Sequence, residues 1–283
     1  MLAYRHGFHA GNHGDVLKHL VLIQVMAHMS AKDKPYRYID THAGAGAYLL
    51  ADRFAQTTGE YEHGIAPLWA RQGEAAMPAA VAEYLALIRQ FNPQGDLAQY
   101  PGSPAIAQAM LRPQDQMRLF ELHTSDHRLL QAHFGRSPNT QVMLADGFEA
   151  LKSQVPPSTR RALVLMDPSY ELVGDYGKVV ASVRDAVTRF AEGVYLIWYP
   201  LVRRSESTHL PRRLERLAPK GWLHASLTLG EPDKDGFGMY GSGVFVINPP
   251  FTLHATLLQT LPWLRDALAT SGRARYLLEH RSV

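Results

Sequence analysis

The chain contains no cysteine, and this absence excludes several kinds of protein. Disulfide scaffolds, thiolate zinc sites and cysteine nucleophiles cannot be built from its 283 residues. Long apolar runs are also missing, since none approaches the roughly 20 residues needed to span a bilayer. The opening residues, MLAYRHGFHAGNHGD, lack the apolar core of a signal peptide. We therefore expect a cytoplasmic protein with no membrane partner.

A strong excess of one charge is missing as well. Lys and Arg number 29 against 26 Asp and Glu, which gives a net charge of +3. This small excess permits a polyanionic partner without requiring one. Arginines gather locally in three clusters, at Arg160 and Arg161, at Arg203 and Arg204, and at Arg212, Arg213 and Arg216. Each cluster is either a binding surface or ordinary solvated charge.

The pattern of apolar residues predicts the fold. Hydrophobic residues make up 46 % of the chain, enough for a full core. Short apolar runs predict buried parallel strands at 36–40, 117–122, 141–146, 162–167 and 194–199. Amphipathic helical patterns alternate with them, and two later runs, 223–229 and 243–248, predict an antiparallel hairpin. We expect an α/β protein with a seven-stranded, mostly parallel, Rossmann-like sheet that ends in this hairpin.

One segment interrupts this alternation. Residues 50–104 separate the first strand from the second by more than one crossover helix needs. Residues 78–92 form a good amphipathic pattern, and the turn-rich YPGSP closes the segment. A plain linker is the alternative, but the apolar content argues against it. We predict a helical insertion subdomain at 50–104 within a single domain, 1–283.

The first chemical motif is YIDTHAGAGAY, at 38–48. A strand ends at Asp40, and the turn that follows carries Gly44 and Gly46. Such a turn lets a ligand approach the backbone. Leu49 stands where a third glycine would complete the dinucleotide fingerprint, so the motif is not that fingerprint. The alternative is a tight turn without a ligand.

Two acids end the next predicted strands. Glu121 ends the second, and Asp146 ends the third, before Gly147 and Phe148. In nucleotide-binding sheets, a carboxylate at the end of the second strand takes the ribose hydroxyls. Asp146 can accept from an adenine amine while Phe148 covers the ring. Either acid alone is as easily a helix cap or a surface carboxylate, but three strand ends in order predict a nucleoside-type ligand.

The third motif is Asp167-Pro168-Ser169-Tyr170, after the fourth strand. An adenine N6 amine is a poor nucleophile because its lone pair is delocalised into the ring. The Asp167 carboxylate and the Pro168 carbonyl can accept its two hydrogens, and proline fixes the φ of this carbonyl. Tyr170 can stack on the base. An ordinary Asp-Pro turn is the alternative in isolation.

A rival motif is Asn248-Pro249-Pro250-Phe251, which matches an amino-methyltransferase tetrapeptide better. It follows the last strand of the predicted hairpin, which runs antiparallel. Its end therefore points away from the predicted ligand edge. We interpret it as a structural turn.

The N-terminal segment interleaves aromatic, basic and glycine residues. This composition favours contact with nucleic acid or cofactor. The candidate RNA-binding residues are Tyr4, Arg5, His6, His9 and Lys18. Its histidines do not follow a zinc-site spacing, so we predict no metal. A frayed terminus is the alternative.

The chain resembles the bacterial family of 23S ribosomal RNA adenine-N6 methyltransferases called RlmJ. The resemblance covers essentially the whole chain and rests on MLAYRHGFHAGNHGDVLKH, DTHAGAGAY, TGEYEHGIAPLW, YPGSPAIA, FELH, ADGF and INPPF. It implies a class I methyltransferase that converts S-adenosyl-L-methionine to S-adenosyl-L-homocysteine and acts as a monomer on naked or early ribosomal RNA. It implies cofactor contacts at His19, His42, Ser103, Glu121, Asp146, Gly147 and Asp167. It makes Asp167 the catalytic acceptor and places Tyr4 at the RNA.

One departure from the family pattern is Ser169, where the family usually has a second proline. The required carbonyl belongs to Pro168, so we expect the chemistry to survive with a more mobile loop. The alternatives are methylation of DNA adenine or protein glutamine, and an RNA-binding protein on a degenerate methyltransferase fold. A dinucleotide oxidoreductase is disfavoured by the missing third glycine.

Overall fold

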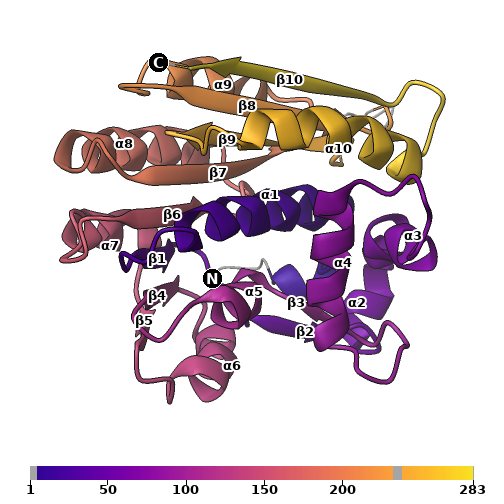
Figure 1. Cartoon of the computed structure of the whole chain (residues 1–283), viewed down its shortest axis with the longest axis horizontal. Helices are drawn as coiled ribbons and strands as arrows, with labels where there is room; N and C mark the ends of the chain where they lie inside the picture. Colours follow the sequence, from indigo (N-terminus) through magenta and orange to yellow (C-terminus); the bar gives the residue numbers. More distant parts are fainter. Residues whose placement is uncertain (1–4, 232–237, 283) are drawn as a thin grey trace.

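The computed structural model describes residues 5–231 and 238–282. Tyr4, a predicted RNA contact, lies outside the described residues. A central sheet has the strand order β10-β8-β9-β7-β6-β1-β4-β5 (Figure 1). Its strands are β1 (Arg37–Asp40), β4 (Gln116–Glu121), β5 (Thr140–Leu144), β6 (Ala162–Met166), β7 (Val194–Leu201), β8 (Trp222–Thr228), β9 (Gly241–Ile247) and β10 (Arg275–Arg281).

Five neighbouring strands of the sheet, β5, β4, β1, β6 and β7, pair in parallel, which confirms the predicted α/β class. The predicted hairpin is confirmed as the antiparallel pair β8 and β9, and β9 also pairs antiparallel with β7. The predicted strand number was wrong, because β10 adds an eighth strand beside β8. As an edge strand, β10 has the charged sequence RYLLEHR rather than an apolar run, and so gave no strand signal.

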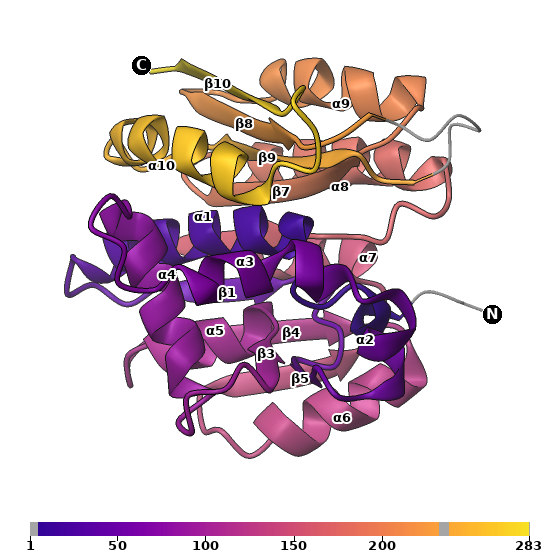
Figure 2. The same ribbon diagram turned by 90° about the vertical axis from the view of Figure 1, so that its right-hand side faces the viewer.

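Helices cover both faces of the sheet (Figures 1 and 2). One face carries α1 (His13–Ser30), α4 (Ala79–Gln90), α5 (Ser103–Met110), α6 (Thr124–Phe134) and α10 (Leu253–Leu268). The other carries α7 (Gly147–Gln154), α8 (Gly174–Arg189) and α9 (Ser205–Glu215). Side chains alternate between the two cores along each strand, so Tyr38 of β1 joins the first and Ile39 the second.

Helix α1 lies between the sheet and the other helices of its face. It packs on β7 and β9 and is covered by α4, α5 and α10. Most of its residues are therefore buried, including the charged Asp15 and Lys18. Burial of two charges in one helix requires partners nearby, and these lie at the site described below.

The chain between β1 and β4 holds several short elements. They are β2 (Ala47–Leu49), α2 (Arg53–Thr58), η2 (Glu60–His63), α3 (Ile65–Ala70), α4, β3 (Gln99–Pro101) and α5. The helix predicted at 78–92 is confirmed as α4, and β2 pairs with β3 in a small second sheet. The status of 50–104 as a separate subdomain stays a prediction.

The topology creates a natural ligand position. Strand β1 lies between β4 and β6, so the strand order reverses at β1. Because the three strands are parallel, their carboxyl ends lie side by side. Ligands of open α/β sheets bind at such a switch point. The short helix η1 (His6–Phe8) precedes α1, and His6 lines this edge. None of the helices within the described ranges is long and apolar enough to cross a membrane.

Candidate active site

Two adjoining cavities open at the carboxyl edge of the parallel strands. The first is lined by most of the predicted cofactor residues: His19, His42, Gly44, Ser103, Glu121, Asp146, Gly147 and Asp167. The second is bounded by the N-terminal segment, the end of β7 and the loop after it. Both cavities share His6, Lys18, Asp167, Ser169 and Glu171. Asp167 therefore lies where the two cavities meet.

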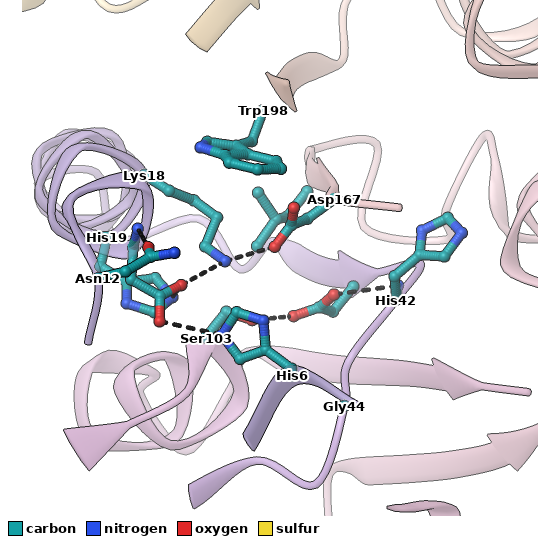
Figure 3. Close-up of polar contacts among 12 residues, drawn as sticks. His6, Asn12, Lys18, His19, His42, Gly44, Ser103, Asp167 and Trp198 are labelled. Atoms are coloured by element: carbon teal, nitrogen blue, oxygen red, sulfur yellow. Dashed lines mark hydrogen bonds and ion pairs between the residues drawn. The ribbon is translucent and has the colours of Figure 1, made fainter. Parts of the chain in front are cut away.

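Lys18 of α1 joins two carboxylates. Its Nζ lies 2.8 Å from Oδ1 of Asp15 and donates to Oδ2 of Asp167 (Figure 3). The side chains of Lys18 and Asp15 are 4 % and 1 % exposed. Oδ1 of Asp167 makes no hydrogen bond within the described part of the chain. The ion pair thus fixes the Asp167 carboxylate and leaves one of its oxygens available.

The surroundings of Asp15 keep this cluster charged. Burial alone would raise the pKa of Asp15, but its interactions with His6 and Lys18 outweigh burial and hold the pKa well below its ordinary range. Burial would likewise lower the pKa of Lys18, yet Asp15 and Asp167 raise it above the ordinary lysine value. His6 Nε2 and the Gly11 N–H both lie 2.9 Å from Oδ2 of Asp15. A fixed cation therefore stands beside Asp167.

Asp40 organises the end of β1. It is fully buried and accepts hydrogen bonds from the hydroxyls of Tyr38 at 2.8 Å and Ser103 at 2.6 Å. The His42 N–H also donates to it, at 3.3 Å. Burial raises the pKa of Asp40. These bonds tie the first residue of α5 to β1 and so place Ser103 in the first cavity.

Glu121 holds the glycine turn against β4. Its two carboxylate oxygens accept from the Gly44 N–H at 2.8 Å and the His123 N–H at 2.7 Å. Burial raises the pKa of Glu121. Gly44 has φ +60°, and a Cβ there would lie 2.4 Å from the Tyr48 hydroxyl oxygen. A side chain at this position would therefore be both strained and blocked.

Asp146 proves to be a helix cap that also lines the first cavity. Its Oδ1 accepts from the Phe148 N–H at 2.9 Å at the start of α7. A Cβ on Gly147 would lie 1.9 Å from the Thr41 carbonyl oxygen, so only glycine fits against the end of β1. The rings of His42 and Phe148 meet edge to face with centroids 4.6 Å apart. These contacts form one wall of the cavity.

His19 is buried in the opposite wall. Its Nδ1 lies 2.8 Å from the Tyr100 hydroxyl, and its Nε2 is buried without a hydrogen-bond partner among the described residues. Burial holds the pKa of His19 well below its ordinary value, so the ring is neutral. An unpaired buried nitrogen beside a cavity is expected to meet a polar ligand atom.

The loop after β6 is anchored through Tyr170. This residue is 3 % exposed and has φ +53°. Its hydroxyl donates to the Trp198 carbonyl at 2.7 Å, and its ring packs against Tyr176 with centroids 4.6 Å apart. Pro168 and Ser169 remain at the cavity surface. The stacking of Tyr170 on a base stays a prediction. Tyr170 borders the second cavity, although little of its side chain is accessible.

The remaining predicted residues fall in different places. His9 lines the second cavity and bonds Glu60 at 2.8 Å. Arg5 lies over the Phe54 ring, 5.2 Å from its centroid, and lines neither cavity. Gly46 also lies outside both linings, because its turn packs on α6 and its carbonyl accepts from Gly102.

The sequence interpretation missed Trp198 and the role of His13. Both line the second cavity, and Nδ1 of His13 and Nε1 of Trp198 are buried without a partner in the described ranges. Trp198 lies above Lys18 and Asp167 in Figure 3. It belongs to the predicted strand 194–199, whose carboxyl end meets the same edge as Asp167. The sequence could therefore have pointed to Trp198 through its place at the same predicted sheet edge as Asp167.

The chain is similar over most of its length to known proteins. A family model described as "Ribosomal RNA large subunit methyltransferase D, RlmJ" matches residues 33–279. A protein named ribosomal RNA large subunit methyltransferase J from Escherichia coli is 44 % identical, over 96 % of both chains. Its namesake from Haemophilus influenzae is 41 % identical, over 99 % of this chain and 98 % of its own. A crystal structure of a Legionella pneumophila protein is 33 % identical, covers 96 % of this chain and 98 % of its own, and has a TM-score of 0.88.

Proposed function

Because the chain belongs to the RlmJ family of ribosomal RNA large subunit methyltransferases, we propose that it transfers a methyl group from S-adenosylmethionine to an adenine N6 amine of 23S ribosomal RNA. The observation that carries this proposal is the position of Asp167, fixed by Lys18 where two cavities meet. One cavity suits the cofactor and the other suits the base.

The residues of the first cavity fit S-adenosylmethionine. When bound, this cofactor supplies an electrophilic methyl group on a sulfonium. Glu121 would accept from the ribose hydroxyls, as carboxylates at this sheet position do. Gly44 and Gly147 line this cavity without a side chain that could enter it, and Nε2 of His19, which has no hydrogen-bond partner among the described residues, offers a polar contact. Within the described ranges, no cluster of three or more His, Asp or Glu side chains could hold a metal.

The site residues would prepare the amine for attack. Oδ1 of Asp167 and the carbonyl of Pro168 would accept the two amine hydrogens, which localises the nitrogen lone pair and aims it at the cofactor. Lys18 holds the carboxylate in this orientation through Oδ2. The catalytic gain comes from positioning, because in-line attack on a sulfonium requires alignment of two bound reactants.

The second cavity would receive the target base. A base stacked in a helix cannot reach a recessed carboxylate, so the adenine must be unpaired or turned out of its stack. Trp198 and His13 line this cavity, and each has a buried ring nitrogen without a hydrogen-bond partner among the described residues. Burial lowers the pKa of His13 to about 4, so its ring is neutral at physiological pH and can both donate and accept. We further expect a monomer that acts in the cytoplasm on RNA not yet covered by ribosomal proteins.

A methyl-transfer assay tests the proposal. The purified protein is incubated with labelled S-adenosylmethionine and, separately, unmodified 23S ribosomal RNA, adenine-containing DNA and a glutamine-containing protein. We expect label in the RNA, recovered as N6-methyladenosine after digestion. Label confined to DNA or protein would contradict the RNA assignment. Binding of S-adenosylhomocysteine without any transfer would support the degenerate-fold alternative instead.

A further inference from the structure

A row of arginines extends from the second cavity along one helix. Arg203 and Arg204 follow β7 and line the cavity. Helix α9 begins at the next residue and carries Arg212 and Arg213, with Arg216 directly after its last residue. The helix packs on α8 and β7, so it is fixed to the same strand that carries Trp198. Arg203 and Arg204 therefore lie at the proposed base cavity, and Arg212, Arg213 and Arg216 lie at the far end of the helix that begins beside it.

The helical period gathers these cations on the outer face of α9. Ser207, Leu210 and Leu214 are buried against the protein. His209, Arg212, Arg213 and Arg216 recur at the i, i+3, i+4 and i+7 spacing, and all four are exposed. The helix thus presents its apolar stripe inward and its basic stripe to solvent.

The arginines of this row have no structural task of their own. Arg203, Arg212, Arg213 and Arg216 make no hydrogen bond or ion pair with any described residue. Other arginines do, such as the exposed Arg189 with Asp185 at 2.7 Å and the half-buried Arg265 with Asp266 at 2.7 Å. Arg204 donates at 3.3 Å to the Tyr170 carbonyl and so links the row to the catalytic loop. Four unpaired guanidinium groups along one track are free to bind an anion.

We propose that this arginine row, formed by Arg203, Arg204, Arg212, Arg213 and Arg216, binds the phosphate backbone of the RNA strand that flanks the target adenine. The proposal rests on the proposed function and adds the surface that holds the substrate outside the cavities. An 11-residue helix is about 16 Å long, which spans the phosphates of several nucleotides. Guanidinium groups match phosphate geometry better than ammonium groups do.

A polyanionic strand fits this surface better than a membrane. Membrane-surface helices insert an exposed apolar face beside their basic one, and the apolar face of α9 is buried on α8 and β7. The row also leads to the cavity that holds Asp167, so a strand that enters the cavity from this side lies along the row. Backbone contacts of this type supply affinity and register without reading the sequence.

The test compares two variants of equal charge loss. The first is Arg212→Gln, Arg213→Gln, Arg216→Gln. The control is Lys32→Gln, Arg128→Gln, Arg136→Gln, which removes three exposed cations that lie after α1 and on or after α6. Binding of in vitro transcribed 23S ribosomal RNA is measured over a salt series. We expect the first variant to lower the slope of log affinity against log salt by about two to three, because each lost phosphate contact contributes roughly 0.7–0.9.

Kinetics provide the second readout. On full-length RNA, the first variant should raise KM about tenfold or more with kcat unchanged, and an Arg-to-Lys version at the same three positions should keep most of the salt slope. An oligonucleotide of about three nucleotides is too short to extend along α9. On this substrate the first variant should have the same KM and kcat as the wild type. Calorimetry with S-adenosylhomocysteine verifies that both variants are folded.

A salt slope and KM equal to those of the control would overturn the arginine row while leaving the methyltransferase assignment intact. The arginine row would be overturned in the same way if the first variant lost binding to phosphatidylglycerol vesicles but kept its binding to RNA. Absence of RNA methylation by the wild type would instead contradict the proposed function itself.

Discussion

Two strand-end tetrapeptides of similar sequence lie at opposite edges of the sheet. Asp167-Pro168-Ser169-Tyr170 follows β6, where Asp167 pairs with Lys18 between two cavities. Asn248-Pro249-Pro250-Phe251 follows β9, which runs antiparallel to β7 and therefore ends at the other edge. Strand direction, rather than the match to an amino-methyltransferase motif, decides which tetrapeptide can meet a ligand.

The two turns use their polar residues differently. The amide of Asn248 donates at 2.7 Å to the carbonyls of both Ala191 and Gly193, so it is consumed in closing a turn. Asp167 accepts a hydrogen bond from Lys18 with Oδ2, and its Oδ1 makes none among the described residues. Phe251 is 87 % exposed, whereas Tyr170 is buried. Oδ1 of Asn248 also lacks a hydrogen-bond partner among the described residues, but it is buried and Asn248 lines neither cavity. The two turns therefore differ in whether their unused acceptor lies beside a cavity.

The largest expected effect is on catalysis by Asp167→Ala. This change removes the acceptor for the amine, and we expect the single-turnover methylation rate to fall by about a thousandfold or more, in line with the loss of a transition-state acceptor. Affinity for S-adenosylhomocysteine should change less than about threefold, because Glu121 and the glycine turn remain. Asn248→Ala serves as the comparison and should leave the rate within about twofold. Equal losses in both variants would contradict the contrast between the two turns.

The next largest effect is on stability, through Asp15→Asn. This variant leaves the buried Lys18 with one fewer charged partner, so the free energy of unfolding at pH 7 should fall by about 3 kcal/mol. The folded-state pKa of Asp15 is lowered, so its contribution is present above the ordinary carboxylate range and is lost as the pH falls through that lowered pKa. Urea unfolding of both proteins should show the gap narrowing at acid pH. A pH-independent gap would mean that packing rather than charge holds Asp15.

A moderate effect is expected for cofactor affinity in Glu121→Gln. Loss of the charged acceptor should weaken binding of S-adenosylhomocysteine by about 10- to 100-fold, as for hydrogen bonds to a charged group. Since burial raises the pKa of Glu121, the wild type should lose affinity on acidification at a higher pH than an ordinary glutamate would allow. The variant should lack this dependence in calorimetric titrations. A shared pH profile would place the titrating group elsewhere.

The smallest effect is expected at the rival turn, for Phe251→Ser. The side chain is almost fully exposed, so its replacement should change the free energy of unfolding by less than about 0.5 kcal/mol and leave methylation unaffected. Thermal unfolding and the methylation assay check both. A marked loss of activity would show that this edge takes part in function after all.

Much of the fold followed from the sequence because strand and helix periods are local signals. The five parallel strands and α4 were predicted from apolar runs and helical spacing. The eighth strand was not, since an edge strand needs no continuous apolar run. Its Tyr276 and Leu278 pack inward, while Arg275, Leu277 and Glu279 are exposed. Such a pattern is weak without knowledge of the strand it joins.

The candidate site was predictable where residues follow strands and less so where they come from elsewhere. Glu121 ends β4, and Asp146 and Asp167 follow β5 and β6, so topology alone brings them together. The pairing of Lys18 with Asp167 joins residues 149 positions apart and depends on how α1 crosses the sheet. Gly46 shares the turn of Gly44 but packs on α6, a difference that depends on tertiary contacts rather than on the motif.

The central claim is that the edge at Asp167 methylates an adenine amine of 23S ribosomal RNA. Its most direct test is nucleoside mass spectrometry of unmodified 23S ribosomal RNA after incubation with S-adenosylmethionine and each of three proteins: wild type, Asp167→Ala and Asn248→Ala. We predict N6-methyladenosine with the wild type and Asn248→Ala, and none above background with Asp167→Ala. The claim would be contradicted if Asp167→Ala produced as much N6-methyladenosine as the wild type, or if the methyl group appeared on another nucleoside.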